Sequence, residues 1–127
     1  MLNRTSVSIT TNAGGAGTGY TPMVAGRVVQ IIYAPHATTP YDGSYDIAVT
    51  TETTGVNIWT QATMNGASVN VISPRFPTYS QAGAVDAVPI VNHIPVAKER
   101  IKLAVTNAGD TKTGTYYIVL DGVIWPT

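Results

Sequence analysis

Apolar and polar residues alternate along several short stretches of the chain, which is typical of β-strands. The clearest case is the pair Arg100–Thr106 and Gly114–Asp121. Because successive side chains of a strand point to opposite faces, each stretch would turn one apolar row inward. These rows are Ile101, Leu103 and Val105, then Tyr116, Ile118 and Leu120. Asn107, Gly109 and Asp110 between them are turn residues, so the sequence predicts a β-hairpin that serves as a rigid core frame.

Four more stretches are expected to be strands. Thr5–Thr11, Ser44–Thr51 and Val56–Thr60 alternate, whereas Gly26–Ala34 is almost continuously apolar. A short apolar run between glycine and proline signals is typical of a central strand buried on both faces. The expected inward residues are Val7, Ile9, Tyr45, Ile47, Val49, Val56, Ile58 and Thr60. Trp59 falls on the opposite face of its strand.

The remaining segments are less regular. Pro35–Pro40 is expected to be a loop, because proline does not fit inside a sheet ladder. Residues 62–89 are expected to form a long irregular excursion that carries one or two short strands, such as Ser68–Ile72. Asp121–Trp125 is expected to add a last short strand, and Ala97–Arg100 to form a helical turn at most.

Short strands at turn-punctuated spacing, without a sustained helical period, indicate an all-β protein. Residues 1–127 are therefore predicted to be one domain with a flexible N-terminal segment. The expected fold is an antiparallel β-sandwich of jelly-roll or immunoglobulin-like Greek-key type. A barrel-like fold is the alternative.

The composition narrows the classes of partner. Seven basic residues balance seven acidic ones, and charged residues make up only 11% of the chain. This balance argues against nucleic acid, whose partners carry a concentrated positive surface. A weakly charged surface suits burial against other proteins, so we expect a homo-oligomer. No apolar stretch has the length of a signal peptide or a membrane span, which predicts cytoplasmic synthesis and no membrane partner.

The chain offers few groups for chemistry. It has no cysteine, and the motif G-x-S-x-G of serine hydrolases is absent. The glycine-rich stretch Asn12–Gly19 is not followed by the Lys-Ser or Lys-Thr pair of a phosphate-binding loop. It is therefore expected to be a flexible loop or a wide turn. His36 and His93 have no evident ligand partners nearby and are expected to be surface histidines. We therefore expect no catalytic residue, no cofactor and no metal.

Two acidic groups leave alternatives open. The carboxylates of Asp42–Asp46 stand at positions that a calcium loop can use, but the full spacing of such a loop is missing. The other interpretation is a β-turn with Asp46 facing water. Glu99 either binds backbone amides of a neighbouring loop or forms a solvated pair with Arg100.

Aromatic side chains and the first residues are the candidates for partner contact. Tryptophan combines apolar area with a polar group and is favoured at interfaces. Trp59, on the polar side of its strand, and Trp125, near the end of the chain, are the expected anchors. Leu2, Asn3 and Arg4 are expected to contribute from the N-terminal segment.

The stretches YDGSYDIAVTTETTGVNIWT (Tyr41–Thr60) and IPVAKERIKLAVTNAGDTKTGTYYIVLDG (Ile94–Gly122) carry a resemblance that covers about two-fifths of the chain. A YDG turn leads into a strand and a T-G-x-x-I-W strand follows. Later, an E-R-I-K strand precedes an N-x-G loop and an aromatic strand. In these features the chain resembles the small β-rich head decoration, cement and minor capsid proteins of tailed bacteriophages.

The resemblance implies a non-enzymatic virion protein, made in the host bacterial cytoplasm and located on the capsid surface. Its partner would be the major capsid protein, whose neighbouring subunits it would cement or decorate, with a trimer as one possible assembly. The alternative is a carbohydrate- or receptor-binding module of a virion fibre or tail.

Overall fold

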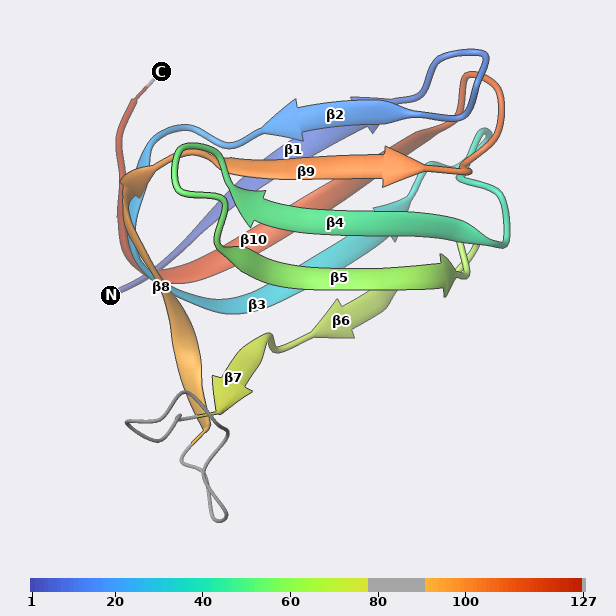
Figure 1. The fold of residues 1–127 in the computed structure, drawn as a ribbon. Coiled ribbons are helices and arrows are strands. Elements are labelled where there is room, and N and C mark those ends of the chain that lie inside the picture. Colours follow the sequence, from blue (N-terminus) through green and yellow to red (C-terminus); the bar gives the residue numbers. More distant parts are fainter. Residues whose placement is uncertain (78–90, 127) are drawn as a thin grey trace.

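The structure is a computed structural model, and it describes residues 1–77 and 91–126. Its strands form two antiparallel sheets that lie face to face (Figure 1). The prediction of an all-β sandwich is therefore confirmed. The two sheets remain separate, so the barrel-like alternative does not apply.

Each sheet combines strands that are distant in the sequence. The six-stranded sheet contains, in spatial order, β1 (Leu2–Thr10), β10 (Thr113–Ile124), β3 (Val24–Pro35), β8 (Val91–Glu99) and β7 (Arg75–Pro77), and its sixth strand, β6 (Asn70–Ile72), also pairs with β3. The four-stranded sheet has the order β2 (Gly17–Tyr20), β9 (Ile101–Thr106), β4 (Tyr45–Thr51) and β5 (Asn57–Met64).

The predicted hairpin is wrong, because its two strands lie in different sheets. β9 pairs with β2 and β4, whereas β10 pairs with β1 and β3. The expected strands and their inward rows are present, but the chain crosses the sandwich between them. β9 and β10 therefore hold the two sheets together by packing across the core.

The backbone of residues 107–112 explains the crossover. Asn107, Gly109 and Thr111 all have positive φ, at 56°, 91° and 53°. The loop bonds to other connections: the Ala108 amide donates to the Gly15 carbonyl at 3.0 Å, and its carbonyl accepts from Asp42 at 2.9 Å. A tight two-residue turn would have kept both strands in one sheet. This loop is held instead by the loop before β2 and the loop before β4.

The inner faces of the sheets form one apolar core. All six residues of the two predicted inward rows are buried, as are Val7, Ile9, Tyr45, Ile47 and Val49. Val56 and Thr60 were also expected inside, but both are exposed. A shift of register between β4 and β5 next to these positions breaks the simple alternation.

Four tyrosines lie at the centre of this core. The rings of Tyr33, Tyr41, Tyr45 and Tyr116 contact one another, with centroids 5.0–5.5 Å apart. Burial raises the pKa of Tyr33 to about 12 and raises those of the other three further. We call this group the tyrosine cluster.

Three expectations about strand ends and faces need correction. The N-terminal segment, expected to be flexible, is strand β1 from Leu2 onward and pairs with β10. β8 continues through Lys98, at a φ of 53°, to Glu99, where a helical turn was expected. The expected separate last strand is the continuation of β10 to Ile124.

The central strand β3 is buried on one face only. Val28, Ile31 and Tyr33 are buried, whereas Gln30, Ile32 and Ala34 are half-buried. The outer side of β3 is thus open to contact.

In the excursion 62–89, β5 extends to Met64 and the short strands β6 and β7 follow, while residues 78–90 lie outside the described part.

The two edge strands of the four-stranded sheet, β2 and β5, differ in their surroundings. β2 lies against β1, because its glycines admit the β1 side chains: a Cβ on Gly19 would meet Val7 at 2.4 Å, and one on Gly17 would meet Ile9 at 2.8 Å. β5 forms the other edge, and its pairing with β4 shifts register at two places.

The core assignment predicts opposite outcomes for two neighbouring positions. Leu103→Asp would bury a carboxylate without a partner and is expected to cost more than about 4 kcal/mol of unfolding free energy. Lys102→Ala, on the outer face of the same strand, is expected to change it by less than about 0.5 kcal/mol. Urea unfolding followed by circular dichroism measures both. If both variants unfolded at the same urea concentration as wild type, the assignment of Leu103 to the inner face and Lys102 to the outer face would be wrong.

Candidate functional site

The outer face of the six-stranded sheet gathers apolar, aromatic and basic side chains. We call it the arginine face. Its members are Leu2, Arg4, Arg27, Ile32, Val71, Arg75, His93, Pro95, Tyr117, Val119 and Asp121. Three of the four arginines of the chain are among them.

An apolar row crosses the middle of this face. Tyr117 lies opposite Ile32, and Ile32 lies opposite Val71, so the three side chains share one side of the sheet. Val71 is 52% exposed. The Arg4 guanidinium lies 5.2 Å from the centre of the Tyr117 ring, an arrangement that positions a cation over an aromatic face. The row therefore offers apolar contact area beside a fixed positive charge.

A second row ends at a shallow depression. Asp121 lies opposite Leu2 on one side and Arg27 on the other, and Arg27 lies opposite Pro95. Arg27 and Pro95, together with Asn92 and His93, line a depression of about 340 Å³. Arg75 lies opposite His93 on the next strand pair. Polar and basic groups thus converge at one point of this face.

The carboxylate of Asp121 is engaged beside this depression. It accepts a hydrogen bond from the Met1 ammonium at 2.7 Å. The pKa of Asp121 is lowered chiefly by that ammonium, and to a smaller degree by Arg27 and His93. Positive groups therefore outnumber negative ones among the described residues of this corner.

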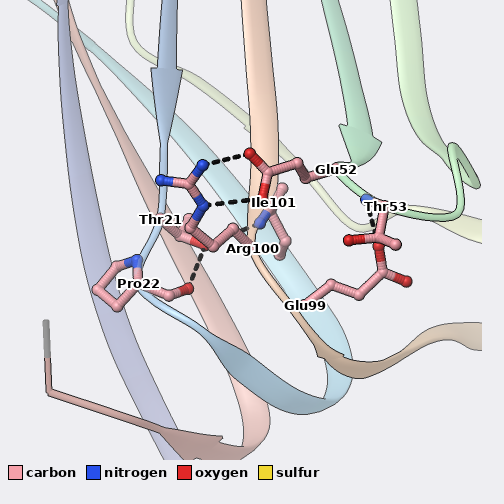
Figure 2. Close-up of polar contacts among 7 residues, drawn as sticks. All are labelled: Thr21, Pro22, Glu52, Thr53, Glu99, Arg100 and Ile101. Carbon is pink, nitrogen blue, oxygen red and sulfur yellow. Dashed lines mark hydrogen bonds and ion pairs between the residues drawn. The ribbon is translucent and has the colours of Figure 1, made fainter.

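A second polar group lies where β8 turns into β9 (Figure 2). One oxygen of Glu99 accepts hydrogen bonds from the backbone amides of Thr53 and Thr54, at 2.7 Å and 3.0 Å. Its other oxygen accepts from the Thr54 hydroxyl at 2.6 Å. The Thr54 hydroxyl and amide hold the pKa of Glu99 below its usual range. Of the two interpretations of Glu99, the one with backbone amides is confirmed.

The neighbouring Arg100 fastens the same turn. Its guanidinium makes two hydrogen bonds to the Glu52 carboxylate (Figure 2) and lies 4.4 Å from the centre of the Tyr20 ring. Glu99 and Arg100 together tie the turn after β4 to the corner between β8 and β9. We call these contacts the turn clamp, and their geometry is that of a structural support.

Trp59 is placed differently from the prediction. Trp59 lies opposite Val49, a fully buried residue, and packs against the core. The shift of register between Val49 and Thr50 turns both Ile58 and Trp59 toward the interior, so the expected outward position of Trp59 is wrong.

Trp125 is half-buried just beyond the end of β10. Its amide donates to the Met23 carbonyl at 2.9 Å, and the Lys98 ammonium lies 5.4 Å from the centre of its ring.

Among the N-terminal candidates, Leu2 and Arg4 belong to the arginine face. Asn3 instead donates its side-chain amide to the Gly122 carbonyl. The structure thus brings Leu2 and Arg4 together and leaves both tryptophans outside that face.

The other polar candidates support local structure. His36 accepts hydrogen bonds from the backbone amides of Thr38 and Thr39, both at 3.2 Å. Asn12 closes the glycine-rich stretch into a turn by accepting from Gly14 at 2.9 Å.

The calcium interpretation of Asp42–Asp46 gains no support from these contacts. The Asp46 carboxylate accepts from the Thr63 amide at 3.0 Å and from the Asn107 side chain, and these two bonds lower its pKa. In residues 1–77 and 91–126, no three acidic or histidine side chains come together as a metal site would require. Nor does that part of the chain contain a helix long and apolar enough to cross a membrane.

Sequence reasoning missed three of the residues that matter on the arginine face. Tyr117 was seen only as part of an alternating strand, and His93 only as a surface histidine. Arg27 carried the one available signal, because it interrupts the apolar run Gly26–Ala34. A charge inside such a run indicates that one side of the strand is exposed.

No protein-family model matches the sequence, and no curated protein matches it. Several solved structures align with this chain. Chitosan-binding module 1 of a chitosanase/glucanase from Paenibacillus sp. IK-5 is 12% identical over 95% of this chain and 94% of its own, with a TM-score of 0.52. This similarity shows that the two proteins share the β-sandwich fold.

Two further structures align with lower TM-scores. A virus-like particle protein of the extra small virus of the prawn Macrobrachium rosenbergii is 12% identical over 94% of this chain and 76% of its own, with a TM-score of 0.38. The family 32 carbohydrate-binding module of C. perfringens NanJ, in complex with galactose, is 11% identical over 93% of each chain, with a TM-score of 0.40.

The turn clamp predicts a pH-dependent contribution to stability. A carboxylate whose pKa is lowered by folding stabilises the folded state above its unfolded pKa, and this is lost as pH falls through the folded value. Wild type is therefore expected to unfold at a higher temperature than Glu99→Gln near pH 7. The difference should shrink as pH falls below about 4.3, the ordinary glutamate pKa.

Thermal melts across this pH range measure the difference. Asp110→Asn, in an exposed loop, controls for the loss of one negative charge. A constant difference at every pH would show that the Glu99 charge does not contribute.

Proposed function

We propose that this protein is a non-enzymatic virion structural protein that binds the outer surface of a bacteriophage capsid. It cements or decorates neighbouring capsid subunits, and the major capsid protein is its partner. The resemblance carried by Tyr41–Thr60 and Ile94–Gly122 supports this assignment. The shared β-sandwich fold is compatible with it.

The observation that carries the proposal is the composition of the arginine face. Aromatic side chains and arginine are enriched in the centres of protein interfaces, where lysine and acidic residues are depleted. On this face an apolar row, in which Val71 is exposed and Tyr117 is half-buried, runs beside Arg4, whose guanidinium already lies over the Tyr117 ring. Such pre-positioned groups lose less conformational freedom on binding.

The low charge of the chain fits association of several copies. With seven residues of each sign, copies would not strongly repel one another when packed side by side. We propose a homo-oligomer on the virion, with a trimer at a local threefold position as the arrangement to test first. Nucleic acid and membrane are not partners in this proposal.

The proposal predicts that a charge in the apolar row abolishes docking. Val71→Asp is expected to weaken binding to capsid shells that lack the protein by at least about tenfold, because the carboxylate would have to be desolvated in the interface. Val71 is exposed, so folding should survive. Co-sedimentation with purified shells measures binding, and the temperature at which heated shells rupture measures cementing.

Thr60→Asp is the matched control. It places the same new charge on the outer face of the four-stranded sheet and is expected to bind like wild type. If wild-type protein neither sediments with the shells nor raises their rupture temperature, the capsid-binding function is wrong. If Thr60→Asp is impaired and Val71→Asp is not, docking uses the other sheet.

A carbohydrate- or receptor-binding module of a virion fibre or tail is the second candidate. The depression lined by Arg27, Asn92 and His93 favours it, because such side chains are suited to hydrogen-bonding sugar hydroxyls. The chitosan-binding module shares the fold, but a basic depression does not suit a positively charged sugar polymer. A neutral or acidic glycan fits better.

Glycan-array binding separates the two candidates. The second predicts saturable binding to a glycan that Asn92→Ala reduces at least about tenfold, with no affinity for shells. Folded Trp59→Ala protein is expected to keep that binding unchanged, because Trp59 lies in the four-stranded sheet and the depression lies between β3 and β8. Shell binding without any glycan signal would reject this candidate.

A further inference from the structure

We infer that the depression between β3 and β8 is a carboxylate-recognition pocket that receives acidic side chains of the capsid partner. This inference rests on the proposed docking function and specifies the chemistry of the partner surface. The pocket would select a partner that presents an aspartate or glutamate opposite Arg27.

Basic groups line this pocket from two strands, and a third lies on the strand next to them. Arg27 projects from the outer side of β3, and His93 from β8. Arg75, opposite His93 on β7, holds its guanidinium against β3 by donating to the Val29 carbonyl at 3.4 Å and to the Pro74 carbonyl at 3.0 Å. The sheet therefore brings the side chains together although they are distant in sequence.

Within residues 1–77 and 91–126, the acid that lies opposite Arg27 makes its hydrogen bond to another group. Asp121 lies opposite Arg27 along the sheet, but its carboxylate accepts from the Met1 ammonium. Among the described residues, the ion pairs are Met1 with Asp121 and Arg100 with Glu52. The guanidinium of Arg27 thus remains available to an incoming anion within that part of the chain.

The chemistry of the lining fits a carboxylate. The planar guanidinium of arginine binds a carboxylate through two parallel hydrogen bonds, and such charge-assisted bonds are stronger than neutral ones. The Asn92 amide can donate a further hydrogen bond, while Pro95 supplies an apolar wall. A volume of about 340 Å³ accommodates a few side-chain groups. The described lining contains no tryptophan, tyrosine or phenylalanine ring on which a sugar could stack, which favours a protein carboxylate.

The test uses the full chain and a hexaglutamate peptide as the probe. In ¹⁵N NMR titrations at low salt, the peptide is expected to shift the amide signals of Asn92 and His93 saturably. Arg27→Gln should weaken this binding at least about tenfold, because the bidentate charge partner is lost. Lys102→Gln, which removes one positive charge from the four-stranded sheet, should leave it unchanged.

Three outcomes overturn the inference. These are no shift at Asn92 and His93, equal loss of binding with Lys102→Gln, and saturable shifts with an oligogalacturonate but not with hexaglutamate. The last outcome would assign the pocket to an acidic glycan. Because the titration contains no capsid, its result is independent of shell binding. Hexaglutamate binding without shell binding would reject the docking function and keep the pocket, whereas shell binding by Arg27→Gln equal to wild type would keep docking and reject the pocket as its determinant.

Discussion

The packing of the tyrosine cluster between the two sheets is the constraint on which the rest of the structure depends. Its hydroxyl groups are buried, so each must find a hydrogen-bond partner inside the core. Tyr41 donates to the Ile9 carbonyl and Tyr33 to the Gly66 carbonyl, both at 2.7 Å, and Tyr116 donates to the Tyr45 hydroxyl at 2.9 Å. These bonds fix β1 and the turn after β5 relative to the core. They also determine which sides of β1, β3 and β10 face outward.

The inner rows of the strands were predictable, but the partners of those strands were not. Alternation alone identifies Leu103 and Ile118 as core residues, because the period of two is a property of the strand itself. Pairing depends instead on how the chain reverses. The loop after β9 contains three residues with positive φ. Asn107 and Gly109 indicate a reversal of the chain, but neither shows whether the next strand pairs in the same sheet. The crossover between sheets therefore had no readable local signal.

The same distinction applies to the candidate site. Glu99 was predicted correctly as one of two alternatives, since an acid at a strand corner next to a turn has backbone amides within reach. Trp59 was misplaced because the shift of register opposite Val49 and Thr50 reverses the side of the next residues on β5. The arginine face was not visible as a unit, because Arg4, Arg27 and Arg75 are far apart in the sequence. Only the order of β1, β10, β3, β8 and β7 makes them neighbours.

The unequal edges of the four-stranded sheet determine how chains can add to one another. β2 is covered by β1, whose Ile9 and Val7 side chains occupy the space over Gly17 and Gly19. β5, at the other edge, pairs with β4 through two shifts of register. An open edge ladder can template strand addition, but these shifts bend β5 and interrupt its regular ladder. Edge-to-edge growth of chains through β5 is therefore disfavoured.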